Sequence, residues 1–330
     1  MKRKDLRNLL ALLLVLGLGT INYFTRVNSD TSGAFILDTY VEIMAKGKSN
    51  DLEAVIDSTF ALMKQYEEQL SFYKGEGELR HLNQQESVDI SSDIYEILKV
   101  SEDLYNKSDG LYDVSIGQLS EVWDFDNNIK PTEAVVDSAL QKIGFSKIRF
   151  DKNSLQKPLE VELNLGSLAK GYIIDKAVDY LQSHKVSLGF VNAGGDIRIF
   201  GQNKPLVIGI QHPRNQRNEI IGKISVPNMA IVTSGDYERF FMNDGKRYHH
   251  ILNPKTGYPA HENISSTVVA ESALLADAWS TASFLMNRED AVKAANQMEG
   301  VEVLLIYEED GELKNIMSEG MKEYILELEI

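Results

Sequence analysis

Residues 163–180 read LNLGSLAKGYIIDKAVDY, and this stretch predicts the junction around which the rest of the chain is organised. The apolar residues of 161–165 predict a short strand, which turns at a glycine–serine pair into an amphipathic helix. The buried side of that helix is expected to hold Ile173, Ile174, Ala177, Val178 and Leu181. Helix N-termini bind anions, so a phosphate or another anion is expected beside Asn164, Ser167 and Lys170. An ordinary strand-to-helix connection explains the same pattern, and this stretch alone leaves both interpretations open.

The composition of the 330-residue chain limits the classes of protein and of site that are possible. With 43% hydrophobic and 25% charged residues it is globular, and one large domain or two closely joined ones would fit. A net charge of −15 without a basic patch argues against a nucleic-acid partner. An anionic ligand remains possible, because one lysine and a metal reverse the local sign. The absence of cysteine excludes disulfides, thiolate metal sites and a cysteine nucleophile.

Residues 1–28 have the pattern of a targeting segment. Lys2, Arg3, Lys4 and Arg7 precede an apolar run over residues 9–24. The run is short for a spanning helix but suits a signal peptide or an uncleaved anchor. The positive flank places the chain beyond it on the extracytoplasmic side of the cell membrane, and no cysteine is present for lipid attachment. A buried core helix is the alternative.

Residues 29–330 are predicted to form one α+β domain with mixed β-sheets packed by helices. Strands are expected over 34–45, 187–201 with a glycine turn, 206–211, 219–226, 230–241 with a break at 233–236, 248–259, 301–307 and 325–330. Helices are expected over 50–70, 91–108 and 271–286, with a loop and a short helix over 71–83. The alternation of strands and non-adjacent helices carries this prediction.

The helix over 271–286 carries a candidate metal site. It is apolar nearly all round, which predicts a buried helix. Asp277 and Thr281 stand four residues apart and share one face. A carboxylate and a hydroxyl one turn apart suit a hard cation such as Mg²⁺, and Ser280 is positioned to add a ligand. Alternatively, Asp277 accepts helix-cap hydrogen bonds from a neighbouring element.

Two further turns are candidate ligand contacts. At Gly194-Gly195-Asp196 the glycines let a ligand approach the backbone closely, and Ser234-Gly235-Asp236 offers hydroxyls and amides to a phosphate. An ordinary hairpin turn is the alternative for each.

Histidine and tyrosine side chains complete the candidates. Strand alternation sends His249 and His250 to opposite faces, so that one faces a site, although a packed or surface histidine is an open alternative for each. Tyr73 and Tyr112 lie near turns and could stack on a ring system, with core packing as the alternative.

Five segments in one order resemble motifs of the ApbE family of FAD:protein FMN transferases, over residues 34 to about 310. They are GLYDVSIG (110–117), NLGSLAKGYIID (164–175), VNAGGDIRIFG (191–201), TSGDY with DGKRYHHILNPKTGYP (233–237 and 244–259) and ADAWST (276–281). The sequence departs from the family pattern at Asn164 and Asn253, where aspartate is usual, and at Asp38, where glycine is common.

The resemblance implies an enzyme that moves FMN from FAD onto a Thr or Ser hydroxyl of a target protein, releases AMP and needs Mg²⁺. It implies metal ligation by Asp277, Thr281, Ser280 and a backbone oxygen of Ser167. It implies contacts to FAD from Leu37, Tyr73, Leu111, Tyr112, Asp113, Asn164, Lys170, Ile251 and the turns Gly194-Gly195-Asp196 and Ser234-Gly235-Asp236. His250 is the expected proton acceptor or positioning group. Alternatives are an FAD pyrophosphatase, a non-catalytic FAD-binding protein of the envelope and a structural surface protein.

Overall fold

The computed structural model of the protein describes residues 27–49, 51–215 and 219–330. The targeting segment predicted over residues 1–28 falls almost entirely on residues 1–26, which lie outside the described residues. Within the described ranges, no helix combines the length and the apolar character that crossing a membrane requires.

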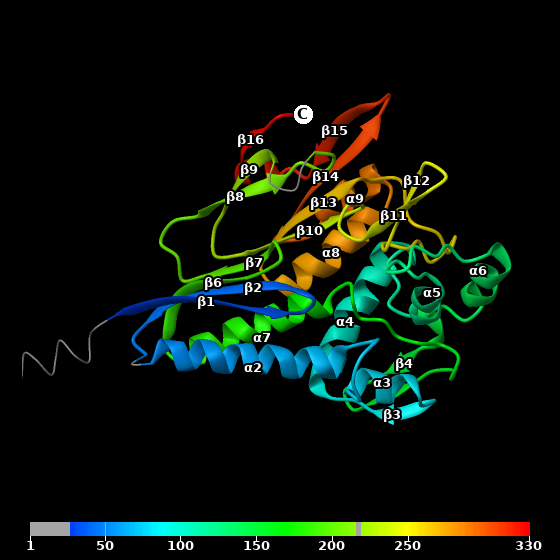
Figure 1. Ribbon diagram of the computed structural model, residues 1–330, viewed down its shortest axis with the longest axis horizontal. Helices are drawn as coiled ribbons and strands as arrows, with labels where there is room; N and C mark the ends of the chain where they lie inside the picture. The colour runs from blue at the N-terminus through cyan, green and yellow to red at the C-terminus, as the bar shows by residue number, and fades with distance from the viewer. Residues whose placement is uncertain (1–26, 50, 216–218) are drawn as a thin grey trace, which may run out of the picture.

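An eight-stranded sheet runs through the molecule in the order β1-β2-β6-β7-β10-β13-β14-β15 (Figure 1). Its strands are β1 (Asn28–Ile36), β2 (Thr39–Gly47), β6 (Val186–Ala193), β7 (Asp196–Phe200), β10 (Ala230–Gly235), β13 (Ser265–Ala270), β14 (Val301–Glu309) and β15 (Glu312–Met317). Each neighbouring pair is antiparallel. Because of the antiparallel register, the β1–β2 turn, the β6–β7 turn and the C-terminal end of β10 lie at the same end of the sheet's strands.

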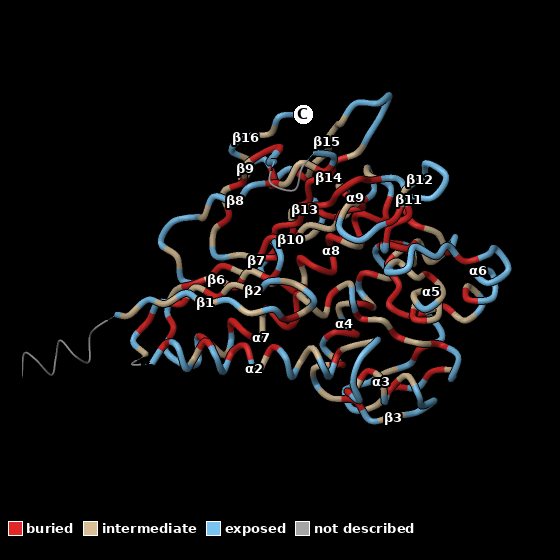
Figure 2. Tube along the Cα trace, in the orientation of Figure 1, coloured by how far each residue is buried: buried red, intermediate tan, exposed pale blue. Residues whose placement is uncertain are grey.

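Helices pack against one face of this sheet, where α2 and α7 run side by side below β1, β2 and β6 in Figure 1. The helices are α2 (Leu52–Leu70), α4 (Ser92–Lys107), α7 (Ala169–Ser183) and α8 (Ala273–Leu285). The apolar face of α7 holds all five residues expected there, each of them buried. Figure 2 shows α8 buried along almost its whole length, as its apolar composition predicts. The main hydrophobic core lies between these helices and the sheet.

Smaller units complete the fold. A three-stranded sheet of β16 (Ile325–Leu328), β9 (Ile220–Val226) and β8 (Leu206–Gln211) packs a second core against the other face of the large sheet. A hairpin of β11 (Phe240–Asn243) and β12 (Lys246–His249) shares a third core with α5 (Gly117–Val122) and α6 (Glu133–Leu140). The remaining elements are α3 (Glu78–Asn83), β3 (Ser87–Asp89), η1 (Phe145–Lys147), β4 (Arg149–Phe150), β5 (Ser154–Gln156), α9 (Arg288–Ala295) and α10 (Met321–Tyr324).

The structure confirms the α+β fold class and corrects several details. The strand pairs among the described residues are antiparallel rather than mixed, with one isolated parallel bridge between Ile116 and Glu162. Residues 161–165 are not a regular strand: their burial alternates, and they are held by that bridge and by hydrogen bonds to Asn83, Val114 and Gly117. The strand expected over 230–241 is two strands, β10 and β11, and the strand expected over 248–259 ends at His249.

The single strand expected over 34–45 is a hairpin. Its two-residue turn is formed by Leu37 and Asp38, with φ of 60° and 54°. Positive φ at both central positions is the geometry of hairpin turns that match the strand twist. Leucine rarely adopts it. The hydrophobic alternation continues through a two-residue turn, so the pattern did not reveal the break.

Candidate functional site

The candidate site lies where the N-termini of α7 and α8 approach each other. Asp277, in the first half of α8, is buried, and its Oδ2 accepts a hydrogen bond of 2.8 Å from the backbone N–H of Gly171 in the first turn of α7. Burial raises the pKa of Asp277 to about 7, and the negative charge of Asp196 acts in the same direction. The cap bond proposed as an alternative role for Asp277 is therefore present, and the carboxylate sits at the positive end of α7.

Lys170 interacts electrostatically both with Asp277 and with Asp196, which follows the β6–β7 turn. Its Nζ lies 2.5 Å from Oδ2 of Asp196, a buried residue at the start of β7. Burial lowers the pKa of Lys170, but the charges of Asp196 and Asp277 outweigh that effect and raise it overall. One lysine is thus paired with Asp196 and influenced by the charge of Asp277, and the anion site expected beside it stays a prediction.

Three hydroxyls gather beside Asp277. The Ser234 Oγ lies 2.7 Å from the Ser280 Oγ and 3.3 Å from the Thr281 Oγ1. Ser280 Oγ donates to the backbone oxygen of Asp277 at 2.8 Å, so the hydroxyl of Ser234 is the donor toward Ser280. The end of β10 and one face of α8 therefore present oxygen atoms to the same place.

The segment before α7 contributes a second group of predicted residues. The Ser167 Oγ donates to the hydroxyl oxygen of buried Tyr112 at 2.9 Å. Burial raises the pKa of Tyr112 far above its usual range, with a smaller contribution from the charge of Asp277. Asn164 Oδ1 accepts from the Gly166 N–H at 2.9 Å, and its side chain lies within hydrogen-bonding range of the exposed Tyr73. Tyr73 thus has the accessible ring, whereas Tyr112 is packed.

The two histidines have the opposite environments that alternation predicted. His249 is buried, with Nε2 2.6 Å from the Ala260 oxygen, and its Nδ1 accepts from the Ile251 N–H at 3.3 Å. His250 is exposed, and its Nδ1 lies 3.3 Å from the backbone oxygen of Arg239. A carbonyl oxygen can only accept, so Nδ1 carries the proton in neutral His250 and Nε2 is the basic nitrogen.

The electrostatic surroundings of His250 keep it neutral. The protein around the ring lowers its pKa by desolvation, and the positive charges of Arg239 and Lys170 act in the same direction.

Apolar residues and the β1–β2 turn lie around these polar groups. Ile251 packs with Leu111 against the end of α8. Leu37 is partly buried against the main core, and the turn that holds it approaches the β6–β7 turn. There the Gly194 N–H donates to the Tyr40 oxygen at 3.1 Å, and a Cβ on Gly194 would lie 2.3 Å from Thr39 Oγ1. Both Gly194 and Gly195 have positive φ, and Gly195 faces open space.

Two predicted contacts have their carboxylates engaged elsewhere. Asp113 Oδ1 accepts from the N–H and hydroxyl of Ser115, and its Oδ2 accepts from the Phe145 N–H. Asp236 accepts a bidentate pair from Arg214 at 2.7 and 2.8 Å and a further bond from Arg247 at 2.8 Å. Gly235, next to it, is covered by the Tyr237 ring. The structure therefore gives both aspartates a role in holding loops.

The residues predicted from the sequence do not include Asp175, Arg198, Arg214 or Arg247. Asp175 in α7 accepts hydrogen bonds from the first two N–H groups of α8, and Arg198 lies 3.5 Å from it. The sequence held a signal for the Asp175–Arg198 pair. On the predicted helix a lysine (Lys170) precedes an aspartate (Asp175), and on the following strand an aspartate (Asp196) precedes an arginine (Arg198), so the charges are opposite in sign. Nothing in the sequence around Asp236 indicates its two arginine partners.

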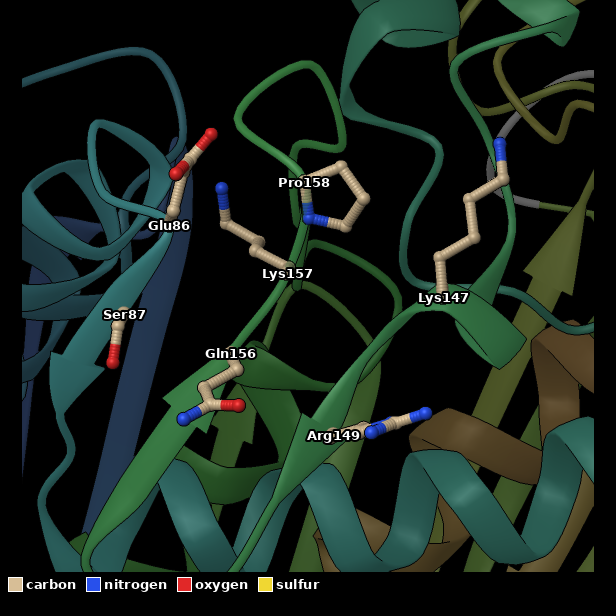
Figure 3. Close-up of a pocket in the computed structure, with 7 residues that line it drawn as sticks. All are labelled: Glu86, Ser87, Lys147, Arg149, Gln156, Lys157 and Pro158. Atoms are coloured by element: carbon tan, nitrogen blue, oxygen red, sulfur yellow. The ribbon is translucent and has the colours of Figure 1, made fainter.

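Two observations concern where else a metal ion or a ligand could bind. Among residues 27–49, 51–215 and 219–330, no group of three or more His, Asp or Glu side chains is arranged to hold a metal. A surface hollow of about 460 Å³ is lined by Glu86, Ser87, Lys147, Arg149, Gln156, Lys157 and Pro158 (Figure 3). None of the predicted site residues lines it, and Lys157 donates to the Asn83 oxygen at 3.2 Å.

The fold and site define a class: an α+β protein in which several backbone turns, a lysine and a helix-buried aspartate lie together at one end of the large sheet's strands. Residues 37–305 match the model of the ApbE family, and the chain belongs to that family. The five motifs, the fold and the family match agree.

Individual relatives give the same result. A protein of Vibrio cholerae serotype O1 named FAD:protein FMN transferase is 30% identical over 331 residues, which cover 96% of this chain and 97% of the relative. A Klebsiella pneumoniae protein of the same name is 31% identical over 274 residues, covering 80% and 85%.

Solved structures of two relatives have a similar fold. The ApbE protein of Thermotoga maritima is similar with a TM-score of 0.81 and 33% identity, covering 90% of this chain and 99% of that one. The flavin transferase ApbE of Vibrio cholerae gives a TM-score of 0.82 at 27% identity, covering 91% and 100%.

Proposed function

We propose that the protein transfers FMN from FAD to a Thr or Ser hydroxyl of an acceptor protein, releases AMP and depends on Mg²⁺. The observation that carries the proposal is the convergence of Asp277, Lys170 and the hydroxyls of Ser234, Ser280 and Thr281. The names of the Vibrio and Klebsiella relatives support the reaction class.

The reaction requires little covalent chemistry from the protein. The acceptor oxygen forms a bond to the phosphorus of the FMN half of FAD, and the bond from that phosphorus to the AMP oxygen breaks. The hydroxyl proton goes to a base, and AMP leaves with the bonding electron pair. Transfer of this kind depends mainly on positioning and on neutralising negative charge. Lys170 supplies a fixed positive charge beside the Gly194-Gly195 turn, where backbone can approach a pyrophosphate closely.

The donor set at Asp277 fits a hard cation. Its raised pKa reflects a buried carboxylate whose charge the surroundings compensate incompletely, and the hydroxyls of Ser280 and Thr281 follow it within the next turn of α8. We assign Asp277, Thr281, Ser280 and the backbone oxygen of Ser167 as the residues that would hold Mg²⁺. The bound ion would neutralise charge on the pyrophosphate and the leaving AMP.

His250 is the proposed proton acceptor. It is exposed, neutral at physiological pH, and has Nε2 as its basic nitrogen. A neutral imidazole can accept a proton, and its lowered pKa makes it a weaker base than an unperturbed histidine. His249 cannot serve in its place, because both its ring nitrogens are engaged in buried hydrogen bonds.

We further propose an extracytoplasmic, membrane-attached location, which rests on the sequence of residues 1–28. Membrane fractionation of expressing cells, followed by protease treatment of intact spheroplasts, tests it. We expect the protein in the membrane fraction and cleavage without lysis. A protein protected until lysis would contradict the proposal.

The function is tested by incubating the purified protein with FAD, Mg²⁺ and an acceptor domain that the Vibrio cholerae relative modifies in a parallel reaction. We expect a covalent FMN adduct by mass and one AMP released per adduct. AMP release without an adduct would indicate an FAD pyrophosphatase instead. Bound FAD with neither product would indicate a non-catalytic FAD-binding protein, and no FAD binding would favour a structural protein.

A further inference from the structure

The first turn of α8 is capped by α7. The Ala273 N–H donates to Asp175 Oδ1 at 2.9 Å, and the Leu274 N–H donates to Asp175 Oδ2 at 2.8 Å. Ser272 accepts the next two N–H groups of the helix, through its side chain at 3.1 Å and its backbone oxygen at 3.0 Å. The N–H groups of the first three helical residues, which a helix start leaves without an intrahelical partner, are therefore satisfied, and the Ala276 N–H makes the first bond of the helix itself.

The capping is reciprocal. Asp277 of α8 accepts the Gly171 N–H in the first turn of α7, while Asp175 of α7 accepts from the first turn of α8. The helices touch between these bonds, because a Cβ on Gly171 would lie 2.2 Å from the Ala273 oxygen. Each helix thus places a carboxylate at the positive end of the other, and neither can shift along its partner without breaking one of the caps.

Strand β7 continues this arrangement with charges of alternating sign. Asp196 pairs with Lys170, and Arg198, two residues later, lies 3.5 Å from Asp175. Residues two apart on a strand share a face and are spaced by about 7 Å. Both partners of these strand residues, Lys170 and Asp175, come from α7. Two salt bridges of opposite polarity therefore join α7 to β7.

We infer that Asp175 is a positioning residue for the proposed reaction, which holds α8 against α7 and thereby sets Asp277 relative to Lys170. Asp175 has both carboxylate oxygens engaged by α8, so it acts through the helix rather than by touching FAD. The role rests on the proposed function, and it predicts that losing Asp175 weakens metal and FAD binding more than its effect on stability accounts for. Residues that orient metal ligands typically contribute about 10- to 100-fold to metal affinity.

The test compares Asp175→Ala and Asp175→Asn with Asn287→Ala. Asn287 caps α9, with Oδ1 accepting from the Glu289 N–H at 3.0 Å, so its loss is a matched cap deletion away from the site. Three quantities are measured for each full-length protein: the Tm from circular dichroism, the Kd for FAD from flavin fluorescence, and the rise in Tm on adding Mg²⁺. The Mg²⁺ concentration for half-maximal FMN transfer is a fourth.

We expect Asp175→Ala to raise the FAD Kd and the Mg²⁺ requirement by about tenfold, and to reduce the Mg²⁺-induced rise in Tm. Asp175→Asn should show a smaller change in the same direction, because its amide oxygen still accepts one N–H. Asn287→Ala should lower the Tm and leave ligand affinities unchanged.

A variant series in which Asp175→Ala behaves like Asn287→Ala would overturn the inference. If Asp175→Ala does not fold, Asp175→Asn decides, and unchanged FAD and Mg²⁺ affinities there would likewise overturn it. A wild-type protein that transfers no FMN would refute the proposed function. The FAD and Mg²⁺ binding measurements would still decide the role of Asp175.

Discussion

At the scale of single residues, the neighbouring histidines His249 and His250 lie in different environments and have different expected roles. His249 is enclosed and donates to the Ala260 oxygen, whereas His250 is open to solvent with Nε2 as its basic nitrogen. Strand β12 ends at His249, whose ring packs against Phe284, and His250 follows the strand with its side chain exposed. The first is expected to matter for stability and the second for chemistry.

Replacing His250 by alanine is predicted to lower the rate of FMN transfer at saturating FAD by about 10²- to 10⁴-fold, the usual contribution of general base catalysis. The Kd for FAD should change little, because the ring is assigned to the acceptor proton. Single-turnover transfer with bound FAD measures the effect. A variant within twofold of the wild type would remove His250 from the mechanism.

Replacing His249 by glutamine is predicted to change how stability depends on pH. Burial lowers the pKa of His249 to about 4, while the unfolded chain has its usual value near 6.5. Between these values the unfolded state binds a proton that the folded state does not, so stability falls as pH drops from 6.5 to 4. The full loss is about 3 kcal/mol, and above pH 6.5 it is absent.

Urea unfolding at pH 7.5, 5.5 and 4.5 checks this effect of His249. The wild type should lose more stability over this range than His249→Gln, since other groups titrate in both proteins. Parallel pH profiles for the two proteins would contradict the role of burial.

At the scale of elements, the contact between α7 and α8 decides the geometry of the site. Their first turns cap each other through Asp175 and Asp277, and the glycine at 171 allows the two backbones to touch. Helix caps contribute about 0.5–2 kcal/mol each, so the pair is a substantial share of local stability.

Gly171→Ala is predicted to lower the free energy of unfolding by about 1–3 kcal/mol despite the higher helix propensity of alanine. The new Cβ would lie 2.2 Å from the Ala273 oxygen, so the helices must separate. Denaturant unfolding measures the change, with Gln182→Ala at an exposed position of α7 as the control. If the glycine variant is as stable as that control, the close contact is not essential.

Elements with a strong periodicity of apolar residues were predictable from the sequence. The buried character of α8 and the apolar face of α7 follow from residue spacing, and both are confirmed. The β1–β2 turn was not predictable, because leucine at positive φ carries no turn signal. Residues 161–165 have strand alternation without a strand partner, since burial period and hydrogen-bonded pairing are separate properties.

At the scale of the whole molecule, the antiparallel register of the large sheet brings together residues far apart in the chain. The turns at Leu37 and Gly194 and the C-terminal end of β10 lie at the same end of the strands. Lys170 and Asp277 lie there too, on the helices that cover one face of the sheet. The motifs predicted which residues to examine. The engagement of Asp113 and Asp236 by loop groups and arginines depends on tertiary contacts that local sequence does not encode.

The account depends most on the charge of Asp277, and Asp277→Asn tests it directly. The amide oxygen can still accept the Gly171 N–H, so the helix contact should survive while the negative charge is lost. The measurement is the rate of FMN transfer as a function of Mg²⁺ concentration, with exposed Asp290→Asn as the control. We predict a Tm near that of the wild type and a loss of at least about 10²-fold in rate for Asp277→Asn alone. Wild-type rate and Mg²⁺ dependence in that variant would contradict the account.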